Sequence, residues 1–91
     1  MENQIKKLLE DHLHPLKLEV IDQSHHHSDH NPQAAKGGTH FAVVIVSQQF
    51  QGKSRVARHR MIYEILKGPL ANGVHALALT TLTPEEMQKP D

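Results

Sequence analysis

The seven residues His40–Val46 (HFAVVIV) constrain the fold more than any other part of the chain. Alternate side chains of an extended segment point to opposite faces, so Phe41 and every second residue after it share one face. The other face, which begins with Ala42, is apolar as well, and β-branched residues predominate. Such a segment suits a strand inside a sheet rather than at its edge. We therefore predict a β-sheet in which residues 40–46 form the central strand.

Two further strands and a first helix are expected from hydrophobic periodicity. Residues 16–22 alternate as a half-buried strand, and residues 74–82 form the third strand. Residues 3–13 carry apolar side chains at helical spacing, which indicates an amphipathic helix. With two more helices near the C-terminal half, the element order is α-β-β-α-β-α. This order predicts an α+β domain in which a three-stranded mixed sheet is covered by helices.

Capping residues indicate where the other two helices begin and end. The second helix is expected to begin at Ser54, as its N-cap, and to stop at Gly68. A short last helix follows Thr83, and Glu86, three residues later, completes a capping box. Residues 88–91 are expected to form a disordered tail.

Residues 23–39 show no periodicity and are expected to form one long loop. Connections of this length are uncommon inside a compact domain and are usually functional or unstructured. The loop holds four of the nine histidines of the chain, which are His25, His26, His27 and His30.

Length and charge limit the possible functions. A chain of 91 residues suits a single domain spanning residues 1–91. Ten lysines and arginines balance ten acidic residues, which argues against a general affinity for nucleic acid. No apolar run reaches the roughly 20 residues of a membrane span, and the charged first residues do not resemble a signal peptide. We therefore expect a cytoplasmic protein without membrane contact.

The residue types present restrict the chemistry. The chain has no cysteine, so a metal site must use nitrogen and oxygen ligands or take its thiolates from a partner. We find no activated nucleophile, no paired carboxylates and no phosphate-binding loop. We therefore do not expect an enzyme.

Six short motifs follow one another along the chain: Thr39-His40-Phe41, Val46-Ser47, Phe50 with Gly52, Arg58-His59-Arg60, Val74-His75-Ala76-Leu77 and Thr83-Pro84-Glu85. Taken in this order they resemble the BolA family, and the resemblance extends from about Ile5 to Glu86. The loop sequence DQSHHHSDH is similar to that of the subtype that carries histidine at this place. The resemblance implies a class II KH-like fold.

The resemblance also implies a [2Fe–2S] cluster shared with a monothiol glutaredoxin. A glutaredoxin cysteine and the thiol of glutathione hold one side of such a cluster. Carried over to this chain, the other side takes the imidazole of His75 and that of His27, which fits the pattern Ser24-x-x-His. Rival donors in the same loop are His25, His26 and His30.

Imidazole ligands suit a protein that receives a cluster or passes it on. Two neutral imidazoles in place of two thiolates on one iron raise the reduction potential of the cluster. Protonation near neutral pH also competes with iron for the ring nitrogen. The thiolates would come from the partner, so the isolated protein is expected to hold no cofactor and to be a monomer or weak homodimer. His40 and His59 are expected to be structural, each with a hydrogen bond.

The second helix and its entry are basic, and two interpretations compete. One is a docking surface for an acidic glutaredoxin or for the carboxylates of glutathione. The other is a nucleic-acid surface, in keeping with the transcriptional, stress and morphology roles attached to the family. A G-x-x-G loop and stacking aromatics, which KH domains and single-strand binders use, are missing or scarce. The basic residues are Lys53, Arg55, Arg58, Arg60 and Lys67.

Overall fold

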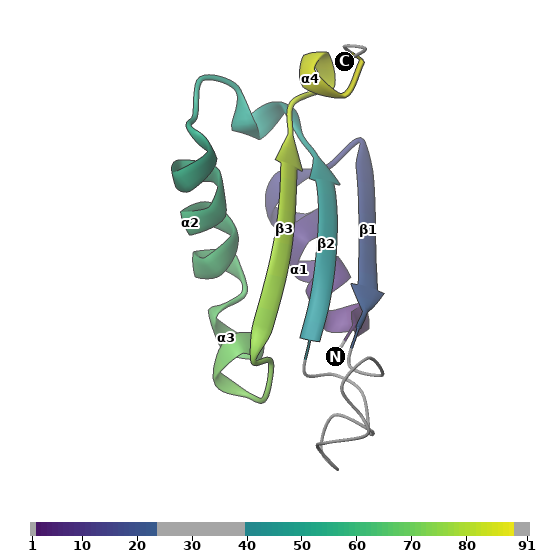
Figure 1. The fold of residues 1–91 in the computed structure, drawn as a ribbon, viewed down its shortest axis with the longest axis vertical. Coiled ribbons are helices and arrows are strands. Elements are labelled where there is room, and N and C mark those ends of the chain that lie inside the picture. Colours follow the sequence, from purple (N-terminus) through teal and green to yellow (C-terminus); the bar gives the residue numbers. More distant parts are fainter. Residues whose placement is uncertain (1, 24–39, 89–91) are drawn as a thin grey trace.

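The computed structural model describes residues 2–23 and 40–88. Within these ranges three strands, four α-helices and one 3₁₀-helix follow one another along the chain (Figure 1). Their order is α1 (Glu2–Leu13), β1 (Lys17–Asp22), β2 (His40–Val46), η3 (Gln48–Phe50), α2 (Arg55–Ile65), α3 (Lys67–Ala71), β3 (Ala76–Leu82) and α4 (Pro84–Gln88).

The strands form one mixed sheet in the order β1-β2-β3, so the predicted three-stranded sheet with β2 at its centre is confirmed. β1 runs antiparallel to β2, and Asp22 lies opposite Phe41. β3 runs parallel to β2, and His40 lies opposite Ala76. A parallel pair needs a long crossover connection, which α2 and α3 supply. The start of β2 and the start of β3 therefore share one end of the sheet.

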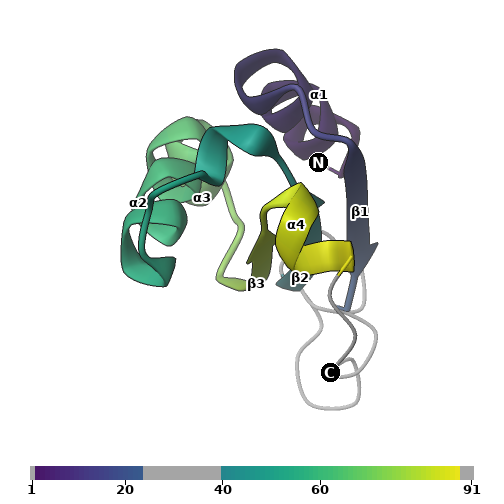
Figure 2. The same cartoon turned by 90° about the horizontal axis from the view of Figure 1, so that it is seen from above.

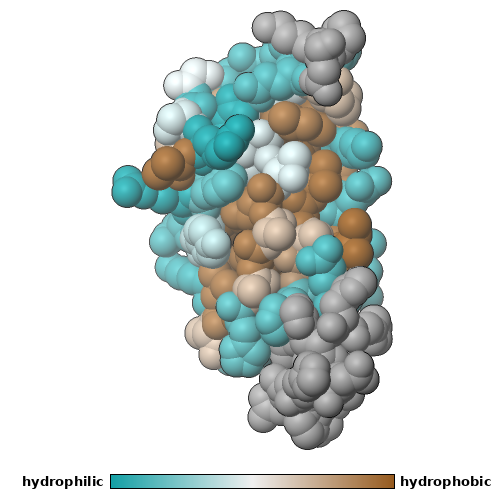
Figure 3. Space-filling view, in the orientation of Figure 1, coloured by the Kyte–Doolittle hydropathy of each residue, from teal (hydrophilic) through white to brown (hydrophobic). Residues whose placement is uncertain are grey.

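The helices α1 and α2 lie on the same side of the sheet, as the two views in Figures 1 and 2 agree. Phe41, Val43 and Ile45 point to this side and are at most 1% exposed. Figure 3 looks onto the other face, where hydrophobic side chains gather over the strands. Ile21 on that face is 48% exposed. The main core is therefore one-sided, and it is completed by the buried side chains Ile5, Leu9, Leu13, Val20, Phe50, Ile62, Leu66 and Val74.

The predicted start of the second helix is confirmed, and its predicted end is wrong. Ser54 caps α2, because its hydroxyl accepts a hydrogen bond from the backbone N–H of Ala57 at 3.1 Å. Gly68 is not the stop: α2 ends at Ile65, and Gly68 lies inside the separate helix α3. Pro69 falls in the first turn of α3, where no intrahelical N–H donor is needed, so a short further helix is tolerated at this place.

The last helix confirms the predicted capping box. The backbone N–H of Thr83 donates to the Glu86 carboxylate at 2.7 Å, and the N–H of Glu86 donates to the Thr83 hydroxyl at 3.2 Å. The helix includes Gln88, which the sequence had assigned to the tail. None of the helices in the described ranges is long and apolar enough to cross a membrane.

Ser47 joins the first helix to the centre of the sheet. Its side chain is fully buried, donates to the backbone oxygen of Leu13 at 2.7 Å and accepts from the N–H of Gln49 at 3.1 Å. Ser47→Ala is expected to lower the free energy of unfolding by about 1–2 kcal/mol, because a buried carbonyl loses its donor and η3 loses its cap. Urea unfolding measures the loss, with exposed Gln48→Ala as the control; equal midpoints for the two variants would contradict this prediction.

Candidate functional site

His75 lies at the end of the sheet where β2 and β3 begin. It immediately precedes β3, and it is exposed. The parallel register sets His40 opposite Ala76, which brings the two imidazoles together with ring centroids 6.4 Å apart and ring planes inclined by 46°. Two histidines that are 35 positions apart in the sequence thus become neighbours through strand pairing.

The histidine-rich segment begins and ends at this same end of the sheet. The backbone N–H of Gln23 donates to the backbone oxygen of His40 at 2.7 Å, so the chain leaves β1 and enters β2 at one place. Neighbouring strands lie about 4.8 Å apart, and β3 follows β2 in the sheet. Both ends of the segment are therefore close to His75. His25, His27 and His30 lie outside the described residues, and their ligand role stays a prediction.

The exposed side chain of His75 offers one ligand for a metal site. Residues 2–23 and 40–88 contain no group of three or more histidine, cysteine or acidic side chains that could hold a metal ion. An exposed imidazole offers an sp² nitrogen that suits iron, zinc or copper. His75 therefore offers one imidazole donor, and a metal site at this end of the sheet would need its other ligands from elsewhere. This donor set is compatible with a shared cluster whose thiolates belong to another molecule.

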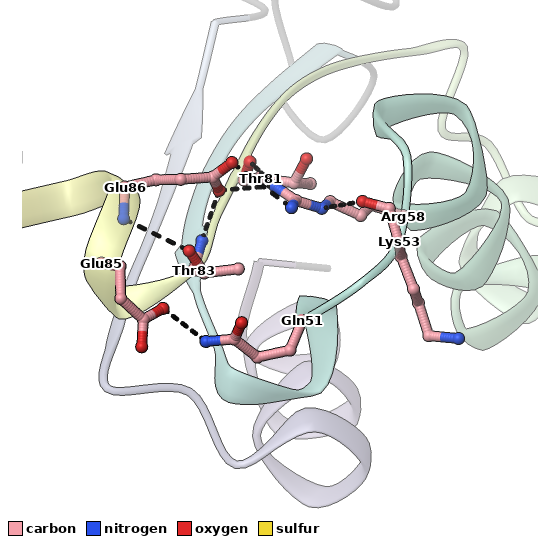
Figure 4. A network of polar contacts seen from close by, with 7 residues as sticks. All are labelled: Gln51, Lys53, Arg58, Thr81, Thr83, Glu85 and Glu86. Atoms are coloured by element: carbon pink, nitrogen blue, oxygen red, sulfur yellow. Dashed lines mark hydrogen bonds and ion pairs between the residues drawn. The ribbon is translucent and has the colours of Figure 1, made fainter.

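Arg58 belongs to the interior and not to the exposed basic surface. It is 9% exposed, and its guanidinium lies 5.8 Å from the centre of the Phe50 ring. Nε donates to the backbone oxygen of Lys53 at 2.9 Å, and Nη1 donates to the backbone oxygen of Thr81 at 3.1 Å and to Glu86 at 2.7 Å (Figure 4). Arg58 therefore ties α2 to the end of β3 and to α4, and little of it is left for a partner.

Glu86 makes the stability of this network depend on pH. The hydrogen bond from Arg58, followed by that from the backbone N–H of Thr83, lowers the pKa of Glu86 to about 2. Its side chain is 44% exposed, so solvent screens part of the effect. In the unfolded chain Glu86 takes up its proton at a higher pH than in the folded protein. The stabilisation from its ion pair is therefore complete above the ordinary pKa of 4.5 and is lost as the pH falls toward 2.

Glu86→Gln is expected to reduce this loss of stability between about pH 4.5 and pH 2. Glutamine retains the capping role but cannot titrate or form the ion pair. Thermal unfolding of both proteins across that range measures the difference, and Glu10→Gln on the exposed side of α1 is the matched control. An unchanged acid profile for Glu86→Gln would contradict the assigned role.

Three other basic side chains are free on the surface. Lys53, Arg55 and Arg60 are exposed, and in the part of the chain that the structure describes their side chains make no hydrogen bond or ion pair. Lys67 is paired with Glu64, with 3.2 Å between Nζ and the carboxylate oxygen. The candidate partner surface on α2 and its entry is therefore carried by the first three, and its role stays a prediction.

Comparison with known proteins identifies the family. The family model described as BolA-like protein matches residues 9–86. The chain is 45% identical over 87 residues to SufE-like protein 1, chloroplastic/mitochondrial, of Arabidopsis thaliana; the match covers 91% of this chain but only 24% of that protein, so this chain spans about a quarter of its length. It is 41% identical over 85 residues to the DNA-binding transcriptional regulator BolA of Vibrio cholerae, and the match covers 93% and 76% of the two chains.

The solved structures agree with this result. The BolA domain of SufE1 from Arabidopsis thaliana superposes with a TM-score of 0.84 at 46% identity, and the match covers 93% of each chain. The family model covers most of the chain, and the fold of the chain matches that of the solved domain. The chain belongs to the family of BolA-like proteins.

Proposed function

We propose that this BolA-like protein acts in iron–sulfur cluster trafficking, and that it completes a [2Fe–2S] cluster shared with a monothiol glutaredoxin. The observation that carries the proposal is the exposed imidazole of His75 beside His40, at the end of the sheet where residues 24–39 leave and return. A chain without cysteine can supply nitrogen and oxygen ligands but no thiolate, and the glutaredoxin and glutathione would supply sulfur.

The ligands from this chain are His75 and one loop histidine, with His27 as the first choice and His25 or His30 as alternates. The position of His75 favours it, because the ring lies on the surface and next to both anchors of the loop. When bound, the cluster carries iron with labile nitrogen ligation at this end, which suits release to an acceptor. The proposal also assigns this chain to the histidine-loop subtype of its family.

Positive charge on α2 and its entry would assist docking of the glutaredoxin. Lys53, Arg55 and Arg60 are exposed cations on α2 and its entry, and an acidic partner surface or a glutathione carboxylate would complement them. Such rim charges contribute more to the association rate than to affinity, so the proposal predicts association that slows as salt is added.

The test is reconstitution of the complex. The protein, a monothiol glutaredoxin, glutathione, ferric iron and sulfide are combined without oxygen. The mixture is separated by size-exclusion chromatography, and its fractions are examined by visible circular dichroism. The proposal requires a heterocomplex with a cluster spectrum different from that of the glutaredoxin alone. A mixture in which the glutaredoxin retains its own spectrum and elutes separately would overturn it.

A second candidate is a DNA-binding regulator, because relatives from Vibrio cholerae and Escherichia coli bear the name DNA-binding transcriptional regulator BolA. The exposed cations Lys53, Arg55 and Arg60 would contact phosphates. Binding of a duplex should then weaken with added salt, and Arg60→Ala should flatten that dependence. Binding that is unaffected by salt and by this variant would exclude the α2 surface as the contact.

A further inference from the structure

A pocket of about 350 Å³ lies between the start of α2 and the end of β3. Figure 1 places these two ends on the same side of the molecule, away from the end of the sheet at which β2 and β3 begin. His75 and Thr81 are six residues apart on an extended strand, which corresponds to roughly 20 Å. The pocket is therefore separate from the candidate cluster site. Its walls are formed by Arg55, His59, Leu79, Thr80, Thr81 and Leu82.

Two polar atoms of the pocket residues are buried without a partner. Nε2 of His59 and Oγ1 of Thr81 form no hydrogen bond within the described part of the chain. Thr81 is only 8% exposed. A buried polar atom without a hydrogen bond costs about 1–3 kcal/mol, so such atoms are uncommon in native proteins. The hydrogen bond predicted for His59 is not formed by Nε2, and an external group would satisfy both atoms.

The third polar group of the pocket carries a positive charge. Arg55 and His59 are spaced i and i+4 on α2, so they share one helix face. Arg55 is exposed, and its guanidinium makes no ion pair with the residues described.

We propose that this pocket binds the oxyanion group of a small molecule, a phosphate or a carboxylate. A guanidinium and a hydroxyl donate hydrogen bonds, and Nε2 of His59 donates in the Nε2–H tautomer. Several donors together match an ionised oxyanion, which has lone pairs for all of them. Leu79 has the same strand parity as Thr81, so its apolar side chain lies on the same face of β3 and would contact the carbon skeleton of the ligand. Both unpartnered atoms are shielded from solvent, so a ligand reaches them only when side chains around the pocket shift.

The test uses the full chain labelled with ¹⁵N and titrated separately with inorganic phosphate and with succinate at constant ionic strength. The proposal predicts amide shifts that saturate and that are centred on Arg55, His59 and residues 79–82. Saturation by one of the two probes identifies the oxyanion that the site prefers, and saturation by both assigns a general oxyanion site.

Two variants test the donors. Arg55→Gln and Thr81→Val are each expected to weaken binding of the saturating probe about tenfold. Arg55 is exposed, so its replacement leaves the fold intact, and this variant decides the outcome even if Thr81→Val unfolds. Arg60→Gln, an exposed cation on the same helix, is the matched control and should bind as the unmodified protein does. Shifts that rise linearly with both probes, or an affinity that Arg55→Gln leaves unchanged, would overturn the proposal.

Discussion

Arg58→Ala is expected to lower the free energy of unfolding by about 2–3 kcal/mol, which corresponds to a fall in Tm of roughly 10–20 °C for a domain of this size. The substitution leaves the backbone oxygens of Lys53 and Thr81 without their donor and removes the ion pair to Glu86. It also removes the cation from the Phe50 ring. The loss is large because one side chain holds three parts of the fold together.

Urea unfolding followed by far-UV circular dichroism measures this effect. Arg60→Ala is the matched control, because Arg60 is exposed on the same helix and its side chain forms no hydrogen bond or ion pair with the described residues. We expect this variant to change the free energy of unfolding by less than about 0.5 kcal/mol. The stability of Arg58→Lys should lie between that of the unmodified protein and that of Arg58→Ala. An ammonium group lacks the planar set of donors with which the guanidinium binds both backbone carbonyls and the carboxylate. Equal stability of Arg58→Ala and Arg60→Ala would contradict the buried role of Arg58.

His75→Ala is expected to reduce cluster occupancy of the reconstituted glutaredoxin complex at least about tenfold, because one iron loses a ligand that no neighbouring cysteine can replace. The ring is exposed, so the unfolding transition of the isolated protein should be nearly unchanged. Iron content and visible circular dichroism of the purified complex measure the occupancy.

Two further variants separate ligation from other effects of the substitution. His75→Cys should restore a cluster, with a lower reduction potential, because thiolate is an anionic ligand. His12→Ala, an exposed histidine on α1, should leave occupancy unchanged. Full occupancy in His75→Ala would remove His75 from the ligand set and leave its position next to His40 without a role in metal binding.

Local patterns predicted the elements that depend on neighbouring residues. The alternation in residues 40–46 identified β2 as the central strand, and the capping box of Thr83 and Glu86 predicted the start of α4. The break between α2 and α3 was missed, because a glycine followed by a proline usually ends a helix. Here Pro69 instead occupies the first turn of α3.

These local patterns did not predict the contacts between segments that are distant in the sequence. Arg58 and Glu86 are 28 positions apart, and charge alone grouped Arg58 with the surface cations of the second helix, although it is buried. The proximity of His40 and His75 follows from the parallel register of β2 and β3, which no local sequence pattern specifies. The pocket beside Thr81 likewise depends on how α2 packs against β3.

The most direct measurement of the central claim is pulsed electron paramagnetic resonance of the reduced shared cluster. This chain alone is labelled with ¹⁵N-histidine, while the glutaredoxin and glutathione remain unlabelled. The account predicts strong couplings from two iron-bound ¹⁵N nuclei, and from one in His75→Cys. A shared cluster without any strongly coupled ¹⁵N nucleus would contradict it, because both nitrogen ligands are assigned to this chain.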